Sequence, residues 1–299
     1  MSETSFNSLL DSFLGYLKNN KSSSENTVTI YAVDLAQYAH FIEAQGIDAL
    51  SVTTPFIRAY LRSLSGFGYA SSSIARKLSA IKAFELYLLE RRLITSDPAA
   101  AVRSPRIPER LPRAISREAM SRLIEQAWTI APRERNGAIM EVLYGCGLRV
   151  AELVSLKWED VDLDERWLKV RGKGDKERLV PFGRYAQDAL RSWRHLCPSA
   201  NVFVFPGSGK GNENITVRTV HRLVVQAALQ AGIEGVTPHS VRHSFATHML
   251  EGGASLNVLQ ELLGHESLLT TQKYLKITPG HLRDSYMAAH PRSGEEETQ

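Results

Sequence analysis

The stretch that begins Thr237-Pro-His239-Ser-Val-Arg242 and continues through a helical segment to Leu-Leu-Gly-His265 and Thr-Thr-Gln-Lys-Tyr274 decides the character of this chain. It places an arginine, imidazoles and a phenol at short, ordered spacings. His239 and Arg242 are three residues apart, so on a helical turn they share a face. A purely structural helical bundle requires no such set, and the pattern therefore indicates a binding or catalytic site.

Two positions far upstream add to this set. Arg149 precedes Glu152 by three residues, and Lys173 lies in a Gly-Lys-Gly connection between two expected strands. Guanidinium groups bind the non-bridging oxygens of a phosphate in a bidentate way, and a phenolate such as that of Tyr274 can attack phosphorus. Each residue also has an ordinary alternative, such as an ion pair, a solvated turn or a half-buried aromatic. Their combination predicts phosphoryl transfer.

The histidines raise the alternative of a metal site. His239, His243 and His248 cluster, and the first two have the spacing of a zinc-binding helix. The HExxH motif requires a glutamate after its first histidine, however, and Ser240 stands there. Arg242 between the histidines would repel a dication. We therefore predict neither a metal nor another cofactor, and we expect His243 and His248 to be structural.

Composition and charge restrict the class of protein. The chain has 299 residues, which predicts two domains, and a net charge of +4, a modest lean towards polyanionic partners. The chain has two cysteines, Cys146 and Cys197, which are too few for a disulfide framework and have no CxxC spacing. This cysteine usage fits a reducing cytoplasm. Neither a secretory signal nor an apolar run of about 18 residues is visible, so we expect a cytoplasmic protein with no membrane partner.

Periodicity and proline content divide the chain. Helical spacing of apolar residues predicts a compact domain of four or five helices at the start. A segment with repeated prolines and arginines follows, and prolines favour an extended path that could lie along a phosphate backbone or simply be solvated. The expected parts are a helical domain over 1–96, a basic Pro-rich linker over 97–114, a second domain over 115–292 and a disordered acidic tail over 293–299.

The second domain mixes helices with a few short strands. Strands are expected over 167–170 and 178–182, with a further one possible over 202–205. Helices are expected over 116–128, 136–144, 148–153, 216–231, 256–263, 268–275 and 281–289. The fold class is therefore mainly α with a small β-sheet in the C-terminal domain.

Five motifs together carry a resemblance to a known family. They are Tyr144-Gly-Cys-Gly-Leu-Arg149-Val-Ala-Glu-Leu153, Gly172-Lys173-Gly174-Asp-Lys-Glu-Arg178, His239-Ser-Val-Arg242-His-Ser-Phe-Ala-Thr-His-Met-Leu250, Leu262-Leu-Gly-His265 and Thr270-Thr-Gln-Lys-Tyr274. The chain resembles the tyrosine recombinase (phage integrase) family, and within it the Xer recombinases that resolve chromosome dimers. The resemblance covers the whole chain. It implies a clamp around duplex DNA, made of a helical SAM-like core-binding domain and a mixed α/β catalytic domain.

The resemblance also implies roles for the site residues. Tyr274 would be the nucleophile that forms a 3′-phosphotyrosyl link and frees a 5′-hydroxyl. Arg149 and Arg242 would clamp the scissile phosphate, and Lys173 would protonate the leaving 5′-oxygen. Because the phosphotyrosine conserves the energy of the link, rejoining through a Holliday junction would need neither ATP nor metal.

The resemblance implies roles for two histidines, and the sequence departs from the family pattern at two places. His239 and His265 would hydrogen-bond the phosphate and assist proton transfer from the phenol. Leu275-Lys276 replaces the Thr-His pair usual after the tyrosine in Xer proteins, and Val241 replaces the commoner leucine. Neither removes a catalytic group, and the C-type or D-type paralogue stays open.

The resemblance implies an assembly as well. The partners would be a double-stranded DNA recombination site and a homo- or hetero-tetramer on two such sites. It leaves open whether a paralogous recombinase shares the tetramer and whether a DNA translocase activates it. Leu282, Tyr286 and Met287 would dock into a neighbouring protomer or cover their own domain. The alternatives for function are an accessory DNA-binding protein without catalysis and a mobile-element integrase.

Overall fold

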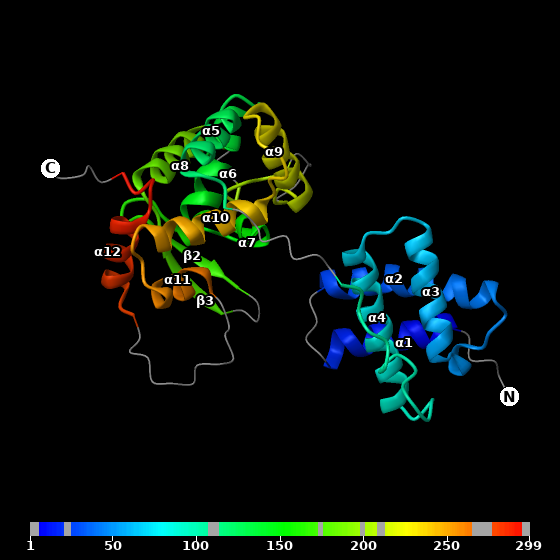
Figure 1. Ribbon diagram of the computed structural model, residues 1–299. Coiled ribbons are helices and arrows are strands. Elements are labelled where there is room, and N and C mark those ends of the chain that lie inside the picture. Colours follow the sequence, from blue (N-terminus) through cyan, green and yellow to red (C-terminus); the bar gives the residue numbers. More distant parts are fainter. Residues whose placement is uncertain are drawn as a thin grey trace. The chain divides into compact units, whose positions relative to one another are not determined.

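The computed structural model describes residues 6–20, 25–106, 114–172, 176–197, 201–207, 213–264 and 277–294. The chain forms two compact units, Met1–Arg110 and Leu111–Gln299, each with its own hydrophobic core. Figure 1 shows the helices of the first unit, and the helices and sheet of the second. Within the described ranges, no helix has the length and apolarity that a membrane crossing requires.

The N-terminal unit is built of helices whose apolar faces meet around stacked aromatic rings. Phe13 packs edge-on against Phe84, and Tyr38 lies against Tyr60 with 5.0 Å between ring centroids. These rings are almost fully buried, which explains why the helical periodicity is so plain in the sequence. The elements are α1 Phe6–Asn20, α2 Glu25–Ala44, a 3-10 turn Ala49–Ser51, α3 Thr54–Gly66 and α4 Ser71–Glu90.

A buried ion pair ties α2 to α4 inside this unit. Asp34 is almost fully buried and accepts a hydrogen bond from the Lys77 ammonium at 2.8 Å, while Arg76 contacts its other oxygen. A buried carboxylate requires such partners, because an unpaired charge in the core is strongly destabilising. The two cations therefore satisfy Asp34 and fix the register of the two helices.

The first half of the expected linker packs against the N-terminal unit. Ala99 and Val102 are buried in its core. The Asp97 carboxylate accepts from the Ala99 backbone N–H at 2.7 Å, and the Thr54 hydroxyl donates to the Pro98 carbonyl at 2.7 Å. Residues 107–113 lie outside the described part of the chain. Residues 97–102 thus form a turn fastened to α3, rather than an extended path.

The C-terminal unit surrounds a small antiparallel sheet with helices. Strands β1 Val161–Asp162, β2 Trp167–Arg171 and β3 Glu177–Pro181 lie in the order β1-β2-β3, and Leu168 pairs with Val180. The mainly helical fold class with a small sheet is confirmed. The helices are α5 Arg117–Ala127, α6 Arg133–Gly145, α7 Val150–Ser155, α8 Arg184–Leu196, α9 Val217–Gln230, α10 Pro238–Glu251, α11 Leu256–Leu263 and α12 Pro279–Ala289, with a 3-10 turn Trp158–Asp160.

Three details differ from the sequence expectation. Helix α8 and the two-residue strand β1 were not predicted, although α8 presents a buried face against α6. The possible strand over 202–205 is a single bridge between Phe203 and Lys157, with Val204 and Phe205 buried. The expected helix over 268–275 falls outside the described residues.

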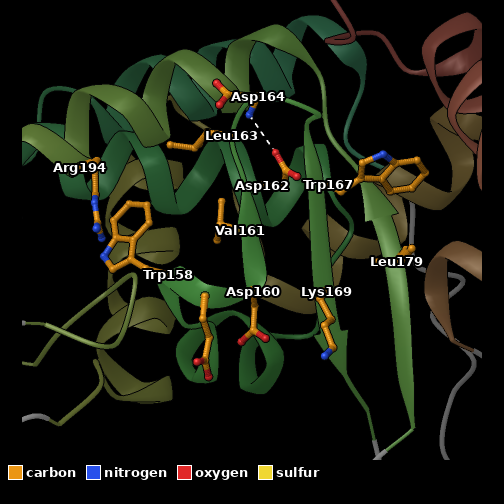
Figure 2. Close-up of a pocket in the computed structure, with 11 residues that line it drawn as sticks. Trp158, Asp160, Val161, Asp162, Leu163, Asp164, Trp167, Lys169, Leu179 and Arg194 are labelled. Atoms are coloured by element: carbon orange, nitrogen blue, oxygen red, sulfur yellow. Dashed lines mark hydrogen bonds between the residues drawn. The ribbon is translucent and has the colours of Figure 1, made fainter.

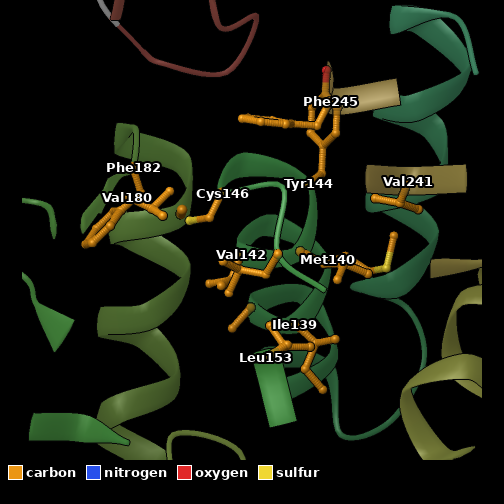
Figure 3. Packing of buried hydrophobic residues seen from close by; sticks show 14 of the residues in the cluster. Ile139, Met140, Val142, Tyr144, Cys146, Leu153, Val180, Phe182, Val241 and Phe245 are labelled. Carbon is orange, nitrogen blue, oxygen red and sulfur yellow. The ribbon is translucent and has the colours of Figure 1, made fainter. Parts of the chain in front are cut away.

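Helix α6 is the centre of the C-terminal core. Figure 3 shows its Ile139, Met140 and Val142 among side chains from β3, α7 and α10. Every residue from Asn136 to Gly145 is buried, so this part of the helix is enclosed on all sides, and its one carboxylate, Glu141, is paired with Arg292. The chain leaves this rigid element directly into Gly147 and Arg149, which gives the latter a well-fixed starting point.

Helix α12 closes the core of its own chain. Leu282, Tyr286 and Met287 are buried in the C-terminal unit, and the Tyr286 hydroxyl donates to the Gly145 carbonyl at 2.7 Å. Of the two interpretations of these side chains, the structure supports coverage of their own domain. Beyond the helix, Arg292 contacts the Glu141 carboxylate, so the end of the described chain is fastened to α6.

Candidate active site

Three of the six predicted site residues lie in the described part of the chain, and the structure gathers two of them around one carboxylate. Arg149 and Arg242 are both within ion-pair distance of Glu152. His239 lies one helical turn before Arg242 on α10. Lys173, His265 and Tyr274 lie outside the described residues.

Arg149 stands at the N-cap of α7, where the chain turns out of α6. Its backbone N–H donates to Glu152 Oε2 at 2.7 Å, and its Nη1 donates to Glu152 Oε1 at 2.9 Å. Glu152 thus caps the helix and holds the side chain of the residue that starts it. The Arg149 side chain is 45% exposed, so part of its guanidinium faces solvent.

Arg242 enters the site from α10 and is far less accessible. Its side chain is 8% exposed. Nη1 donates to the Gly147 carbonyl at 2.6 Å, and Nη2 donates to the Leu263 carbonyl at 2.7 Å. These two bonds hold the guanidinium between the turn after α6 and the end of α11. Arg242 is therefore held in a fixed orientation before any ligand binds.

Carbonyl groups at the C-terminus of α11 accept hydrogen bonds from Arg149 and Arg242. The last carbonyls of a helix lack intrahelical partners and carry its negative dipole end. Here the Leu263 carbonyl also accepts from Arg149 Nη1 at 3.3 Å, and that of Gly264 accepts from Arg149 Nη2 at 3.5 Å. Gly264 ends the helix in the left-handed region, with φ of 61°. Because His265 is the next residue, the arginines lie against the backbone that precedes it.

Two groups that organise this cluster, Glu152 and Arg178, are not among the site residues predicted from the sequence. The spacing of Glu152 from Arg149 fits an ordinary ion pair, and the motif that contains Arg178 implies no role for it. In the structure Arg178 donates to both oxygens of Glu152, at 2.9 Å each. A signal for it was present, because Arg178 and Val180 share the inward face of β3 and a cation on a buried face needs a partner.

The electrostatics of the cluster favour an anionic ligand. Three guanidinium groups, Arg149, Arg178 and Arg242, share the single carboxylate of Glu152. Burial would raise the pKa of Glu152, but the hydrogen bonds and charge of Arg178, followed by those of Arg149, hold that pKa below its ordinary value. Burial, with the neighbouring cation Arg149, lowers the pKa of Arg242 to about 10. The carboxylate stays ionised and the excess positive charge remains.

The histidines of α10 lie in different environments. His239 is exposed in the first turn, and His243 is half-buried. His248 is buried, and its Nδ1 lies 2.8 Å from the Tyr144 hydroxyl. Among the described residues no group of three or more His, Cys, Asp or Glu side chains is arranged to hold a metal ion. The packing of His248 agrees with the structural role predicted for it.

The hairpin that carries Lys173 is described on both sides of its tip. Strand β2 ends at Arg171, which pairs with Glu177 at the start of β3, and Gly172 N–H donates to the Lys176 carbonyl at 2.8 Å. The two predicted strands are therefore confirmed as antiparallel neighbours, and residues 173–175 between them lie outside the described part of the chain. Since Arg178 is the second residue of β3, its bonds to Glu152 hold the start of this strand, next to the connection, beside the arginine cluster.

A separate hollow lies on the outer face of the sheet (Figure 2). It encloses about 640 Å³, and its lining includes Trp158, Trp167 and Leu179. Arg194 lies over the Trp158 ring at 4.3 Å from its centroid. No described residue of the predicted site lines this hollow. The candidate active site is therefore the arginine cluster around Glu152 and not the hollow.

Comparison with family models identifies the class. Residues 113–281 match the phage integrase family, and residues 10–92 match the phage integrase N-terminal SAM-like domain. The first match alone covers more than half of the chain, and this protein belongs to the phage integrase family. The predicted resemblance is thereby confirmed.

Curated relatives narrow the class to tyrosine recombinases. Tyrosine recombinase XerC of Xanthomonas axonopodis pv. citri (strain 306) is 39% identical, over 96% of this chain and 97% of the relative. Tyrosine recombinase XerC of Halalkalibacterium halodurans is 38% identical, over 95% of this chain and 97% of the relative. The predicted assignment to an enzyme of site-specific DNA recombination, with Xer-type relatives, is confirmed.

A solved structure shows the same fold. The crystal structure of a lambda integrase tetramer bound to a Holliday junction covers 100% of this chain and 80% of that chain, with a TM-score of 0.70 and 20% sequence identity. The fold of the two units is therefore that of a tyrosine recombinase.

Proposed function

We propose that this enzyme cuts and rejoins duplex DNA with Tyr274 as nucleophile and with Arg149 and Arg242 as the clamp of the scissile phosphate. The observation that carries the proposal is the pair of arginines fixed around Glu152 with an excess of positive charge. A phosphodiester gains negative charge on its non-bridging oxygens in the transition state, and preorganised guanidinium donors stabilise that charge without a metal.

The proposed step conserves atoms and charge. The phenolic oxygen of Tyr274 bonds to phosphorus, the bond from phosphorus to the 5′-oxygen breaks, and a 3′-phosphotyrosine remains. Lys173, whose place in the sequence is between β2 and β3, gives its proton to the 5′-oxygen. His239 and His265 hydrogen-bond the phosphate and assist removal of the phenol proton. Rejoining reverses these steps with the 5′-hydroxyl of the partner strand.

We assign the DNA-binding surfaces and assembly on the same basis. The helical domain over 1–96 and the catalytic domain over 115–292 would hold one half-site, joined by the basic linker over 97–114, with 293–299 as a tail. Phosphate contacts would make the affinity strongly dependent on salt. We propose a tetramer on two DNA sites, which the shared fold with a lambda integrase tetramer bound to a Holliday junction supports.

The target we propose is a dif-like site, at which the enzyme resolves chromosome or plasmid dimers in the cytoplasm. The full-length similarity to XerC proteins supports this target. A paralogous recombinase would complete a hetero-tetramer and a DNA translocase would activate it, whereas a homo-tetramer would act alone. Reconstitution with and without these two proteins separates the arrangements.

A suicide substrate tests the chemistry. The DNA site is first recovered by sequencing the DNA that the protein binds and cuts in cells, and a nick is then placed so that cleavage releases a short fragment. The wild type should become covalently attached to this duplex, and Tyr274→Phe should bind it without attachment. Attachment of the phenylalanine variant would show that another residue is the nucleophile. Specific binding by the wild type without attachment in any partner combination would favour an accessory protein.

A modified leaving group tests Lys173. Lys173→Ala should slow cleavage of the normal duplex but spare a substrate whose 5′-oxygen is replaced by sulfur, because a thiolate leaves without a proton. An equal loss on both substrates would remove Lys173 as the general acid. Arg171→Ala, beside the same hairpin connection, is the control and should leave both rates within about threefold of the wild type.

A further inference from the structure

Arg178 is bonded to protein acceptors through all three of its guanidinium nitrogens. Nη1 and Nη2 donate to the two oxygens of Glu152 at 2.9 Å each, and Nε donates to the Leu262 carbonyl at 2.8 Å. Its side chain is 8% exposed. All three nitrogens of the planar guanidinium group donate to acceptors inside the protein. Arg178 is therefore poorly placed to contact a phosphate directly.

The partners of Arg178 belong to the segments that carry the catalytic groups. Glu152 holds both the backbone and the side chain of Arg149. Glu152 Oε2 also lies 3.7 Å from Arg242 Nη1. The strand that contains Arg178 begins four residues after Lys173 in the sequence and pairs with β2, which ends two residues before Lys173. A single side chain therefore joins the surroundings of both phosphate-clamping arginines to the strands that flank Lys173 in the sequence.

The contact with α11 extends this junction towards His265. Three consecutive carbonyls end that helix, and each accepts from an arginine: Leu262 from Arg178, Leu263 from Arg149 and Arg242, and Gly264 from Arg149. Gly264 also lies against the Arg178 side chain, because a Cβ added there would be 3.1 Å from Arg178 Cδ. The backbone immediately before His265 is thus fixed by the same residue.

We propose that Arg178 is a positioning residue of the recombinase, which acts through Glu152 and the end of α11 to hold Arg149, Arg242 and the Lys173 hairpin in one arrangement. The inference rests on the proposed function of those residues. A lysine offers one nitrogen on a flexible stem, so it cannot bridge both oxygens of Glu152 and the Leu262 carbonyl together. Misplacing catalytic groups by about 1 Å lowers a rate by about 10²-fold.

The first experiment measures cleavage and binding separately. Single-turnover cleavage of the nicked suicide duplex is compared for the wild type, Arg178→Lys, Arg178→Met and Tyr274→Phe. Both Arg178 variants should cleave about 10²-fold more slowly while their DNA affinity stays within about threefold. Arg171→Met, an exposed arginine on the neighbouring strand β2, is the matched control and should cleave at the wild-type rate.

A double variant separates positioning from folding. Arg178→Met alone removes the guanidinium that donates to both oxygens of the buried Glu152 carboxylate, and this loss destabilises the fold. Glu152→Gln/Arg178→Met removes the anion with its cation, so its thermal stability should recover while the cleavage rate stays low. Recovery of the rate together with the stability would show a merely structural role and overturn the proposal.

The pH dependence provides a readout that folding alone would not move. Glu152 faces Arg149, Arg178 and Arg242, and the bonds and charge of Arg178 are the foremost cause that lowers its pKa. Loss of Arg178 should raise that pKa, so cleavage by Arg178→Met should fall at a higher pH than wild-type cleavage when the buffer is acidified. An unchanged pH profile would contradict the proposed link.

The outcomes distinguish the two proposals. Tyr274-dependent attachment with wild-type cleavage rates in both Arg178 variants would refute the role of Arg178 and leave the proposed function intact. Attachment that persists in Tyr274→Phe would refute the proposed nucleophile and, with it, the inference for Arg178.

Discussion

Arg242 and Gly147 meet through a 2.6 Å hydrogen bond from the guanidinium to the carbonyl, and Phe245 of the same helix fills the space beside that glycine. Gly147 has φ of 57°, a conformation that residues with a Cβ rarely adopt. A Cβ added there would lie 2.3 Å from Phe245 Cδ1. The turn after α6 thus depends on a residue without a side chain.

Gly147→Ala should destabilise the C-terminal unit and displace Arg242. Left-handed backbone strain and overpacking together should lower the free energy of unfolding by at least about 2 kcal/mol. Urea unfolding followed by tryptophan fluorescence measures this, because Trp128, Trp158, Trp167 and Trp193 all lie in that unit. Gly280→Ala, where nothing lies within 4 Å of the added Cβ, is the control and should stay within about 1 kcal/mol. Equal effects of both changes would contradict this explanation.

Arg292→Met should produce a pH-dependent loss of stability. Burial raises the pKa of Glu141, and Arg292 opposes that rise. Without Arg292 the folded-state pKa rises further above the unfolded value, so the penalty is absent below the ordinary pKa of about 4.3 and grows as the pH rises. We expect a loss of about 3 kcal/mol in the free energy of unfolding at pH 8 and a smaller loss at pH 5.

The double variant Glu141→Gln/Arg292→Met is the control for this pair. Its stability deficit should no longer change with pH, leaving a constant loss from the contact of Arg292 with the Tyr185 ring at 4.0 Å. Urea unfolding at pH 5, 6.5 and 8 gives the comparison. A deficit of Arg292→Met that is the same at all three values would rule out Glu141 as its cause.

The N-terminal unit should lose stability as the pH rises, because of Glu85. Burial, with the nearby Asp97 carboxylate, raises the pKa of Glu85 to about 8. A group with a raised folded-state pKa stabilises fully below its unfolded value and ceases to do so as the pH passes the folded value. The free energy of unfolding should therefore fall by about 1.4 kcal/mol per pH unit between pH 5 and 7.

Glu85→Gln should remove most of that dependence. Amide hydrogen exchange of the peptide around Phe84 and Leu88 in the full chain, compared with the wild type at each pH, measures it. The variant should be better protected than the wild type at pH 8 and similar at pH 5. Glu90→Gln, an exposed position at the end of the same helix, is the control. Equal protection of Glu85→Gln and the wild type at pH 8 would argue against a buried ionisation.

The sequence predicted most helices, because local chemistry marks their ends and faces. Thr237 caps α10 through the Ser240 N–H, and Pro55 lies in the first turn of α3. Helix α8 was missed because only Leu190 and Trp193 among its four buried residues are large apolar side chains, whereas Ala186 and Ala189 are small. The prolines around Ala99 predict an extended segment. Its burial depends on tertiary contacts, such as the hydrogen bond from Thr54 of α3 to Pro98, which the local sequence does not reveal.

The site could be predicted only as a set of residues. Spacing and resemblance selected Arg149 and Arg242, since ordered motifs are local properties of the chain. The role of Glu152 depends on Arg178, which is 26 residues away and is brought to it by the sheet. Such a contact leaves no periodic signal, and only the inward position of Arg178 on β3 suggested it.

Arg242→Lys should separate positioning of the phosphate clamp from simple charge. Arg242 bridges the Gly147 and Leu263 carbonyls from two nitrogens, which a single ammonium cannot do while it also faces the DNA phosphate. We expect single-turnover cleavage of the suicide duplex to fall at least about 10²-fold, as for loss of one preorganised donor, with DNA affinity within about threefold. Arg191→Lys, an exposed arginine paired with Asp164 at 3.1 Å, should cleave normally. Cleavage by Arg242→Lys within about fivefold of the wild type would mean that a positive charge alone suffices at this position, and the bidentate clamp would have to be abandoned.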